Sequence, residues 1–600
     1  MANHVIVGAG AAGLYTAYRL LSSGALAQDD TVQLYEWGDR PGGRIFTYTF
    51  PDEVGGNGLY CEFGGMRFAV DGANFANGNP ISEGHVLVQY MIREMGLSTK
   101  VVDFHMSTDR LYYLRGTQHY ESALTTLGPL PYQFDARAKT YITGNVKPPH
   151  TFTADNILGA IAGTFAPSLE MSNSFRQQWC DYFGTGTVQA PAATRAFPEG
   201  TLVSGMGYWN LLFDQLGDEG FDYVADATGY TSNVINWNAA DAMQANNDYG
   251  SGSTYMRLDG GYSVLFEALA AEITGLAENY PGSGIRYGQQ LTCIAEATDG
   301  TTTCQFLREG GRERTETAVS ADFLYLAMPR RALEMVGNSS GADSLLNRAA
   351  MQYFIESSVD QPAIKVVLLF DTAWWTDPAC KFPPRLVDPM APNGSSPQAQ
   401  WVGGDSITDL PLRMIYYFGN NVPGGPGVTG GPYVVLASYD DMNYAQFWNE
   451  LETQGDVTTA PSLRRQPLSG PTALPTDSAM AELLLRQLAD VHGMPVELIP
   501  PPTALYYQDW GQDPYGAGYH GWAAHYNICE AMDRIRAPYQ RIFNEADRRV
   551  FIIGSCYSFD QAWVEGAFCT AESVLQEFIN LPQFVADMPP YTLVCKTGTA

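Results

Sequence analysis

Glycine spacing near the start of the chain could bind the phosphates of a dinucleotide. The run Gly8-Ala9-Gly10-Ala11-Ala12-Gly13 has glycines where a Cβ would clash with a pyrophosphate, and a helix N-terminus after it supplies a favourable dipole. Glu36, 23 residues after Gly13, can bind ribose hydroxyls and would repel a 2′-phosphate. Next, Arg40-Pro41-Gly42-Gly43-Arg44 offers glycines and two cations for a second approach to the pyrophosphate. The alternative for this segment is a solvated turn with two salt-bridged arginines.

A βαβ unit must position these residues. Residues 4–7 form a short apolar strand pattern, and the helical pattern after the glycines has Leu14, Ala17, Leu20 and Leu21 on one face. A second strand pattern, residues 31–37, carries Glu36. A lone glycine motif is weak evidence, but here strand, turn, helix, strand and acid coincide. The sequence therefore predicts a dinucleotide site.

The rest of the chain is less regular. Residues 100–240 mix aromatic helical patches with Pro and Gly breaks and lack clear alternating strands, so we expect an inserted, mainly helical region. Strand patterns return at residues 290–306 and 321–327. Stretches rich in Pro, Gly, Ser and Asn are expected to be long loops, at residues 376–405, 419–432 and 453–478.

Composition limits the classes of protein and partner. With 600 residues and 45% apolar positions, the chain can form two or three domains. A net charge of −30 argues against nucleic acid or an anionic membrane as partner. Nine cysteines without a CxxC pair fit neither a disulfide framework nor a zinc site, so we expect mostly buried free thiols and no metal. We find neither a signal peptide nor an apolar run of the roughly 18 residues a membrane span needs, and we predict a cytoplasmic protein.

Residues 40–44 resemble the Arg-x-Gly-Gly-Arg signature that follows the dinucleotide turn in the flavin-containing amine oxidases. Residues 257–262 are similar to that family's segment before the second flavin-domain helix. Residues 550–554 and 563–567 resemble the strand and helix that close over the flavin. The resemblance implies FAD as cofactor, bound noncovalently because nothing marks a cysteine or histidine as an attachment point.

The resemblance also implies which residues contact the cofactor. Leu291 matches the position whose backbone contacts the adenine, and Trp510 matches a tryptophan packed at the flavin. The chain departs from the family at Ser555, where an acid is usual, and at Ala562, where a glycine is common. The predicted cofactor residues are Gly8, Gly10, Ala11, Ala12, Gly13, Glu36, Arg40, Gly43, Arg44, Gly64, Gly65, Met66, Arg67, Leu291, Trp510, Gly554, Ser555, Ala562, Trp563 and Val564.

Residues 62–68 narrow the expected substrate. In the amino-acid oxidases of this family an arginine in a similar Gly-Met-Arg context binds the substrate α-carboxylate, and Arg67 has the matching position. A planar guanidinium suits a carboxylate, and such a charge-assisted bond contributes roughly 1.5–3 kcal/mol. Helix capping or pairing with an internal acid is the alternative for Arg67. A tyrosine usually donates the second bond, and we predict Tyr439, with Tyr416 in reserve.

Three more residues are candidates for catalysis. Lys365 stands alone in the apolar residues 363–370, where burying an ammonium is costly, and the family's matching lysine holds a water near the flavin N5. The alternative is an edge-strand lysine that reaches solvent. Trp563 resembles a tryptophan beside the substrate amino group. His520 is expected near the loop that faces the substrate, although a lone histidine is more often structural.

The sequence thus predicts an α/β fold: a Rossmann-like FAD-binding domain (GR2-type), a mixed-sheet substrate domain and an inserted helical region. We expect a homodimer or higher homo-oligomer. The predicted ranges are 1–70, 240–335 and 540–580 for the FAD-binding domain, 71–100 and 336–539 for the substrate domain, and 101–239 for the insertion.

The predicted function is an FAD-dependent oxidase that uses O2 and converts L-amino acids to 2-oxo acids, ammonia and hydrogen peroxide. Two other flavoenzymes stay open: an amine or polyamine oxidase, which Arg67 disfavours, and a decarboxylating amino-acid 2-monooxygenase. A non-catalytic FAD-binding or escort protein is the alternative of another class, suggested by Ser555 and Ala562.

Overall fold

The computed structural model describes most of the chain. The described residues are 2–104, 107, 109–124, 131–133, 153–166, 175–246, 253–310, 313–386, 403–421, 431–452, 468, 470–586 and 588–596. Parts of the three predicted long loops lie outside these residues.

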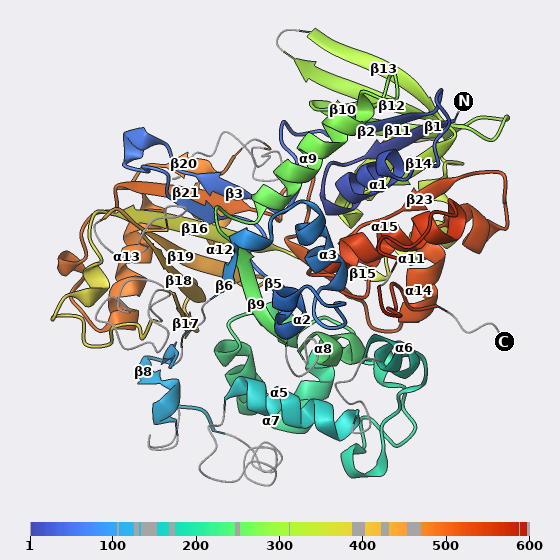
Figure 1. The fold of residues 1–600 in the computed structure, drawn as a ribbon. Helices are drawn as coiled ribbons and strands as arrows, with labels where there is room; N and C mark the ends of the chain where they lie inside the picture. Colours follow the sequence, from blue (N-terminus) through green and yellow to red (C-terminus); the bar gives the residue numbers. More distant parts are fainter. Residues whose placement is uncertain are drawn as a thin grey trace.

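A five-stranded parallel sheet carries the glycine turn. Its strand order is β10 (Gly284–Arg286), β2 (Thr31–Tyr35), β1 (Asn3–Val7), β14 (Phe323–Leu326) and β23 (Val550–Ile552). The predicted βαβ unit is confirmed, since helix α1 (Ala11–Ser22) follows β1 and precedes β2. Helix α1 packs between α9 (Ser263–Ala277) and α15 (Val564–Phe578) (Figure 1). Segments from the start, middle and end of the chain therefore form one unit.

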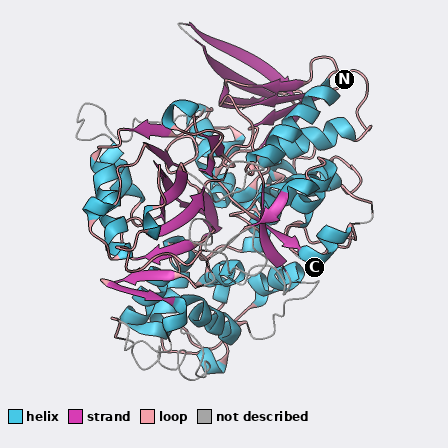
Figure 2. Ribbon diagram, turned by 60° about the vertical axis from the view of Figure 1, so that its left-hand side comes forward, coloured by secondary structure: helices cyan, strands magenta, loops and turns pink. Residues whose placement is uncertain are grey.

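An antiparallel sheet extends from this unit. It consists of β11 (Gln289–Glu296), β12 (Thr302–Gly310) and β13 (Glu313–Ala321). Figure 2 shows the long β12–β13 hairpin projecting beyond the helices. Leu291 lies on β11, the strand of this sheet that packs against β2.

A mixed eight-stranded sheet forms the core of the second unit. Its order is β20 (Thr472–Leu474), β21 (Ala504–Asp509), β16 (Ala363–Phe370), β19 (Tyr433–Asp441), β18 (Met414–Gly419), β17 (Asp405–Thr408), β7 (Leu111–Leu114) and β8 (Thr117–Tyr120). All eight residues of β16 are buried, as expected for a strand in the middle of a sheet covered on both faces, and seven of the eight are apolar. Helices α12 (Ala445–Glu452) and α13 (Ala479–His492) contact this sheet.

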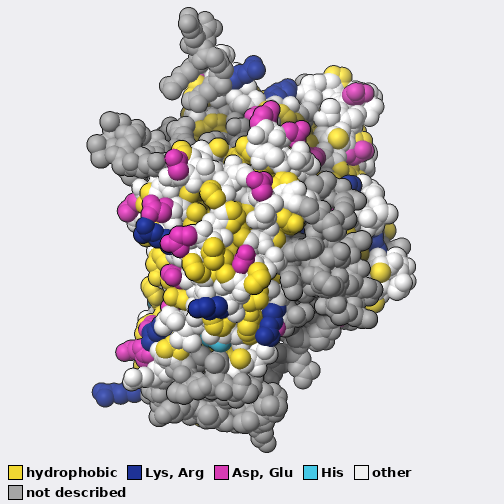
Figure 3. Space-filling view, turned by 90° about the vertical axis from the view of Figure 1, so that its left-hand side faces the viewer, with side chains coloured by type: hydrophobic (Ala, Val, Ile, Leu, Met, Phe, Trp, Pro, Cys, Tyr) yellow, Lys and Arg dark blue, Asp and Glu magenta, His cyan; other side chains and the backbone are white. Residues whose placement is uncertain are grey.

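The outer face of this unit is mixed in character. Figure 3 shows a broad apolar area on the face that lies at the left in Figure 1, with acidic and basic side chains scattered around it. The described part of this face has no continuous basic stripe.

Among the described residues, helices α5 to α8 make up most of the region predicted as an insertion, and α8 begins at its last residue. They are α5 (Ala154–Phe165), α6 (Phe175–Thr185), α7 (Tyr208–Ala227) and α8 (Ala239–Asn246). They lie together at the bottom of Figure 1. A small sheet connects this region to the others through β5 (Phe68–Asp71), β9 (Ser253–Leu258) and β6 (Val101–Asp103).

The expectation that residues 100–240 lack strands is wrong at their beginning, where β6, β7 and β8 lie. Strands β7 and β8 form a hairpin whose two turn residues, Arg115 and Gly116, have φ of 45° and 78°. Positive φ at both positions is typical of the tight turns that match strand twist. The division of the whole chain into three units stays a prediction.

The cysteines follow the expectation in part. Six of the seven free cysteines among the described residues are buried, but Cys180 and Cys595 form a disulfide. Their separation of 415 residues gives no spacing signal, so sequence reasoning missed the pair. Among the described residues, no helix is long and apolar enough to cross a membrane.

Candidate functional site

A cavity of about 250 Å³ collects most of the predicted site residues. Those on its wall are Gly8, Gly10, Ala11, Ala12, Glu36, Gly43, Arg44, Gly64, Gly65, Leu291, Lys365, Tyr439, Trp510, Gly554, Ser555, Ala562, Trp563 and Val564. The cavity thus lies between the parallel sheet and the eight-stranded sheet. Gly13, Arg40, Met66, Arg67 and His520 do not line it.

The three glycines of the turn are required for three different reasons. Gly8 has φ of 102°, which a side chain rarely adopts. A Cβ on Gly13 would lie 1.9 Å from the Gly8 carbonyl oxygen, so this glycine permits close helix packing. A Cβ on Gly10 would meet no protein atom within 4 Å and would project into open space. Gly10 therefore leaves room for a ligand rather than for the protein itself.

Helix α1 begins at this open space. Its N-cap, Gly10, makes no side-chain cap, and no acid stands in its first turn. The first N–H groups of a helix have no intrahelical acceptor and carry partial positive charge. Because Ala11 and Ala12 line the cavity, these groups can bind an anion such as a pyrophosphate.

Glu36 lies directly after β2 and lines the same end of the cavity. Its two carboxylate oxygens accept hydrogen bonds of 2.7 Å from the backbone N–H groups of Ala9 and Gly38. Burial raises the pKa of Glu36, and these two bonds oppose the rise. The carboxylate is thereby fixed beside the glycine turn.

The segment 40–44 docks on the glycine turn. The Gly42 N–H donates to the Ala9 carbonyl at 2.8 Å, and Gly43 approaches Gly10 closely. The Arg40 guanidinium donates to three carbonyls of its own loop and lies 3.7 Å from the centre of the Phe46 ring. Arg40 thus shapes the loop. Of the two arginines, Arg44 is the one that lines the cavity.

Arg44 is held by groups distant in sequence. It donates to the Gly518 carbonyl at 3.0 Å and lies 3.5 Å from the Ser555 hydroxyl. It also lies 3.3 Å from the Nδ1 atom of His520. Ser555 therefore occupies the cavity wall where the family acid was expected, and its hydroxyl faces a cation.

His520 does not reach the cavity. It lies fully buried on β22 (Tyr519–Trp522), with Nε2 3.3 Å from Asp360. Burial lowers the pKa of His520, but the charge of Cys556 and the hydrogen bond with Asp360 outweigh burial and raise it. The His520 ring contacts Arg44 and does not line the cavity, and its place near the loop that faces the substrate stays a prediction.

Lys365 lies buried on β16 at the opposite end of the cavity, so the alternative of an edge lysine that reaches solvent is wrong. Its Nζ donates to the Glu62 carbonyl at 3.0 Å and to the Gly64 carbonyl at 2.6 Å. The ammonium also lies 4.6 Å from the centre of the Tyr439 ring. Burial lowers the pKa of Lys365, although the nearby acidic groups act in the opposite direction.

Arg67 lies just beyond this end of the cavity, inside an aromatic cluster that we call the Arg67 cluster. Its members are Arg67, Phe104, Tyr230, Tyr255, Tyr416, Tyr439 and Trp563. The guanidinium carbon is 4.6 Å from the centre of the Tyr255 ring and 5.3 Å from that of Phe104. Tyr439 and Trp563 belong to the Arg67 cluster and also line the cavity, so the cluster adjoins the cavity.

Hydroxyl groups collect beside the guanidinium. The Tyr230 and Tyr416 hydroxyls are hydrogen-bonded at 2.9 Å, and the Tyr230 ring packs 5.1 Å from that of Tyr439. Burial raises the pKa of all three tyrosines, and the Arg67 charge opposes the rise in each. The cluster thus joins one cation with several hydroxyl donors, which suits a carboxylate.

Sequence reasoning missed several of these residues. Tyr230 lies between α7 and α8, Tyr255 on β9 and Phe104 after β6, and no motif surrounds any of them. Tyr519 and Cys556 on the cavity wall were also missed. Each is next to a predicted residue in the sequence, Tyr519 beside His520 and Cys556 beside Ser555. Including the direct neighbours of the predicted residues would have found both.

Comparison with known proteins gives the family. The family model for flavin-containing amine oxidoreductases matches residues 11–575. The chain belongs to this family. Aplysianin-A of Aplysia kurodai is 24% identical over 603 residues, covering 96% of this chain and 90% of that protein. L-amino-acid oxidase 4 of Hebeloma cylindrosporum is 22% identical over 604 residues, covering 96% of this chain and 83% of that protein.

The fold agrees with the family. The structure of putrescine oxidase bound to putrescine superposes with a TM-score of 0.56 at 14% identity, covering 96% of this chain and 99% of that one. The predicted α/β fold with its Rossmann-like cofactor domain is confirmed. As a member of the amine oxidoreductases, the protein is a flavin-dependent oxidoreductase.

The residues present fit a flavin dinucleotide. The open space at Gly10, the uncapped start of α1 and the fixed Glu36 carboxylate form a cradle for a pyrophosphate and a ribose. From there the cavity extends past Arg44 and Ser555 to Lys365, Trp510 and Trp563. Trp510 is itself fixed by donating its indole N–H to the Phe63 carbonyl at 2.7 Å.

Proposed function

We propose that this protein is an FAD-dependent L-amino acid oxidase. The observation that supports the proposal best is the Arg67 cluster, in which a guanidinium and tyrosine hydroxyls adjoin the Lys365 end of the flavin cavity. An oxidase for simple amines has no use for a half-buried cation at the substrate. A substrate that bears a carboxylate next to its amine gains a charge-assisted bond there.

The chain's own residues bind and orient this substrate. Arg67 binds the α-carboxylate, and Tyr230, Tyr416 and Tyr439 of the same cluster are the candidates for the second donor. Tyr230 and Tyr416 already form a hydrogen-bonded pair, whereas the face of Tyr439 is covered by Lys365. We therefore favour the Tyr230–Tyr416 pair over Tyr439. Aromatic rings around the site exclude water, and fixing both ends of a substrate removes much of the entropic barrier.

The overall reaction balances as L-amino acid, oxygen and water giving 2-oxo acid, ammonium and hydrogen peroxide. Bound FAD supplies the two-electron oxidation of the Cα–N bond and passes the electrons to oxygen. Trp563 forms part of the wall beside the reacting amine. Lys365, whose pKa is lowered by burial, holds its amino group at the wall between two carbonyls, where it can hold a water.

A screen of products tests the proposal. Purified enzyme is incubated with each of the twenty L-amino acids and with the amines obtained by removing their carboxylates, and peroxide is measured. We expect peroxide and a 2-oxo acid from at least one amino acid. An amide with carbon dioxide would identify a decarboxylating 2-monooxygenase, peroxide from amines alone would identify an amine oxidase, and no flavin reduction by any compound would favour a non-catalytic flavoprotein.

A cytoplasmic location and a homodimer also stay proposals. The Cys180–Cys595 disulfide argues against the first, because disulfides persist mainly in oxidising compartments. Thiol counting on protein taken from its cells without reductant tests the location. Sedimentation of the purified protein tests the dimer.

A further inference from the structure

The segment between β23 and α15 forms one wall of the flavin cavity. Ser555, Cys556, Gln561, Ala562 and Trp563 of this segment line the cavity. Asp560 of the same segment does not line it and is buried, with a fully buried carboxylate that forms an ion pair with Arg176. The position of this wall is therefore fixed by a residue outside the cavity.

Arg176 comes from α6, in the helical insertion, and its guanidinium is buried. Its Nε donates to the Thr592 carbonyl at 2.7 Å and its Nη2 to the Leu593 carbonyl at 3.4 Å. The guanidinium carbon also lies 4.3 Å from the Phe559 ring centre and 4.7 Å from that of Tyr591. Arg176 thus joins the cavity wall to the C-terminal segment 591–595.

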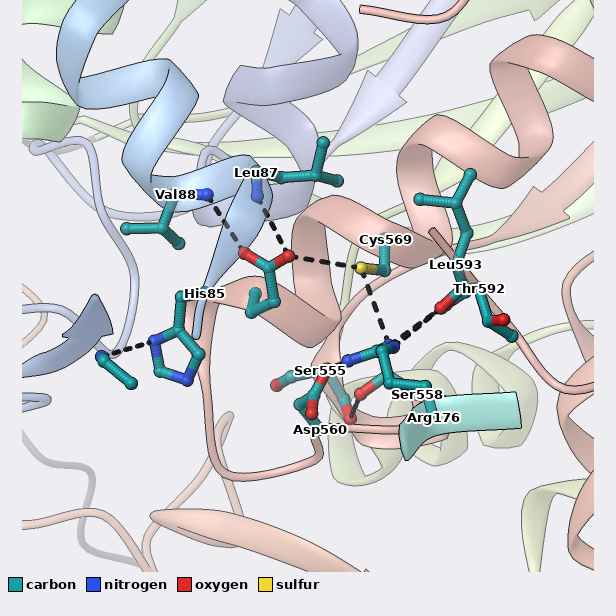
Figure 4. Close-up of polar contacts among 12 residues, drawn as sticks. His85, Leu87, Val88, Arg176, Ser555, Ser558, Asp560, Cys569, Thr592 and Leu593 are labelled. Atoms are coloured by element: carbon teal, nitrogen blue, oxygen red, sulfur yellow. Dashed lines mark hydrogen bonds and ion pairs between the residues drawn. The ribbon is translucent and has the colours of Figure 1, made fainter. Parts of the chain in front are cut away.

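The network continues from Arg176 towards the substrate end (Figure 4). The Cys569 sulfur lies 3.8 Å from Nη2 of Arg176 and 3.7 Å from a carboxylate oxygen of Glu565. The Glu565 carboxylate accepts the N–H groups of Leu87 and Val88, each at 3.0 Å, in the first turn of α3 (Val86–Glu94). Burial raises the pKa of Glu565 to about 7, and the bonds from α3 oppose the rise. An acid at a helix N-terminus stabilises that end.

His85 completes the connection to the Arg67 cluster. It stands directly before α3, and its ring centre is 4.8 Å from that of Trp563. Its Nδ1 accepts the Ala69 N–H at 3.0 Å, two residues beyond Arg67 on β5. Buried contacts, together with the backbone of residues 85–88, therefore connect Arg176 to the strand that follows Arg67.

The C-terminal segment 591–595 is attached to α6 by a disulfide. Cys595 is bonded to Cys180 on the same helix as Arg176, and its N–H contacts the Met532 sulfur. Segment 591–595 thus closes over Arg176 and is bonded covalently to α6. Removing one partner of a buried ion pair leaves the other charge buried and unpaired.

We propose that Arg176 is a positioning residue that holds the cavity wall 554–563 in its flavin-binding position, and that the disulfide-anchored segment 591–595 keeps Arg176 in place. This inference requires only that the cavity binds the flavin that this family uses. It does not depend on the proposed L-amino acid substrate.

The test measures flavin affinity and spectrum rather than turnover. Arg176→Ala, Arg176→Lys and Asp560→Asn are made in the full chain, and the Kd of FAD is measured by flavin fluorescence on reconstitution. We expect a rise in Kd of at least about tenfold for Arg176→Ala and Asp560→Asn, equivalent to about 1.4 kcal/mol. We also expect a shifted visible flavin band and partial recovery in Arg176→Lys, which keeps the charge.

Arg93 provides a matched control. Its guanidinium also holds backbone carbonyls, those of Asn74 and Phe75, but that segment does not line the cavity. Arg93→Ala is expected to lower thermal stability without changing the FAD Kd or the flavin spectrum. Arg176→Ala with unchanged Kd and spectrum but the same loss of stability would overturn the inference.

The double variant Cys180→Ser/Cys595→Ser keeps the test decisive if Arg176→Ala does not fold. Without the disulfide, segment 591–595 is held by noncovalent contacts alone. We expect the FAD Kd to rise in the same direction and by a smaller factor. An unchanged Kd in both this double variant and Asp560→Asn would contradict the proposal.

Discussion

The two ends of the cavity are built from different parts of the protein. At the dinucleotide end, backbone N–H groups, the start of α1 and the space left by Gly10 form the cradle for the pyrophosphate. At the substrate end, side chains from distant segments meet, including Arg67, Tyr230, Tyr255 and Tyr439. The dinucleotide end binds through backbone groups and needs positions without a side chain. The substrate end binds through particular side chains and needs those side chains to be present. Substitutions should therefore act differently at the two ends.

The largest expected effect tests the backbone end. Gly10→Val should leave the apoprotein folded, because a Cβ there meets no protein atom within 4 Å, but should fill the space for the pyrophosphate. We expect the FAD Kd to rise at least about 100-fold, equivalent to about 2.7 kcal/mol. Flavin fluorescence and circular dichroism measure the two properties.

Gly13→Val is the matched comparison for Gly10→Val. Its Cβ would lie 1.9 Å from the Gly8 carbonyl oxygen, so this variant should lose folding as well as flavin. Equal damage to the fold by both variants would show that Gly10 serves the protein rather than the cofactor.

The next effect tests the side-chain end. Arg67→Ala should raise KM for a reactive L-amino acid by about 10- to 150-fold, since a bond to a charged group contributes about 1.5–3 kcal/mol. KM for the amine that lacks the carboxylate should stay the same. Steady-state peroxide assays measure both, and an unchanged KM for the amino acid would remove Arg67 from the substrate site.

A smaller effect is expected for Tyr230→Phe. A neutral hydrogen bond contributes about 0.5–1.5 kcal/mol, so KM for the amino acid should rise about 2- to 13-fold. Tyr182→Phe is the control, because that hydroxyl lies in the same helical region and donates to the Phe165 carbonyl at 3.0 Å. Similar KM values in both variants would remove Tyr230 and leave Tyr416 or Tyr439 as the second donor.

The smallest expected effect concerns Lys365 and pH. Burial lowers the pKa of Lys365 to about 8 in the folded chain, below the ordinary value of about 10.4. Between pH 8 and about 10.4 the unfolded chain therefore binds more protons than the folded chain. Stability of the parent therefore rises with pH across this window. Lys365→Met should melt about 1 °C higher at neutral pH, with the gain shrinking towards pH 10. A gain that is independent of pH would mean that folding does not shift the pKa of Lys365, which would contradict the lowered value.

The same contrast explains how much could be predicted from the sequence. The glycine turn, Glu36 and residues 40–44 are contiguous, and their roles follow from local backbone geometry, so the sequence predicts that end of the cavity well. Even there, the sequence does not show that Arg40 binds its own loop instead of lining the cavity. Its guanidinium donates to three loop carbonyls.

The substrate end and the supporting contacts depend on tertiary structure. Tyr230 and Tyr255 enter the site through packing between regions far apart in sequence, which no local pattern encodes. His520 was predicted near the substrate from its neighbours in sequence, and its contact with Arg44 is visible only in the fold. The Cys180–Cys595 bond spans 415 residues and is visible only in the fold.

Anaerobic flavin reduction tests the central claim, that the side-chain end selects a carboxylate. The enzyme is mixed with a reactive L-amino acid, or with the matching amine without its carboxylate, and the flavin band is followed over time. We expect complete bleaching by the amino acid, and reduction by the amine that is at least about tenfold slower at equal low concentration, equivalent to about 1.4 kcal/mol. Equal or faster reduction by the amine, or no reduction by any of the twenty L-amino acids, would contradict the claim.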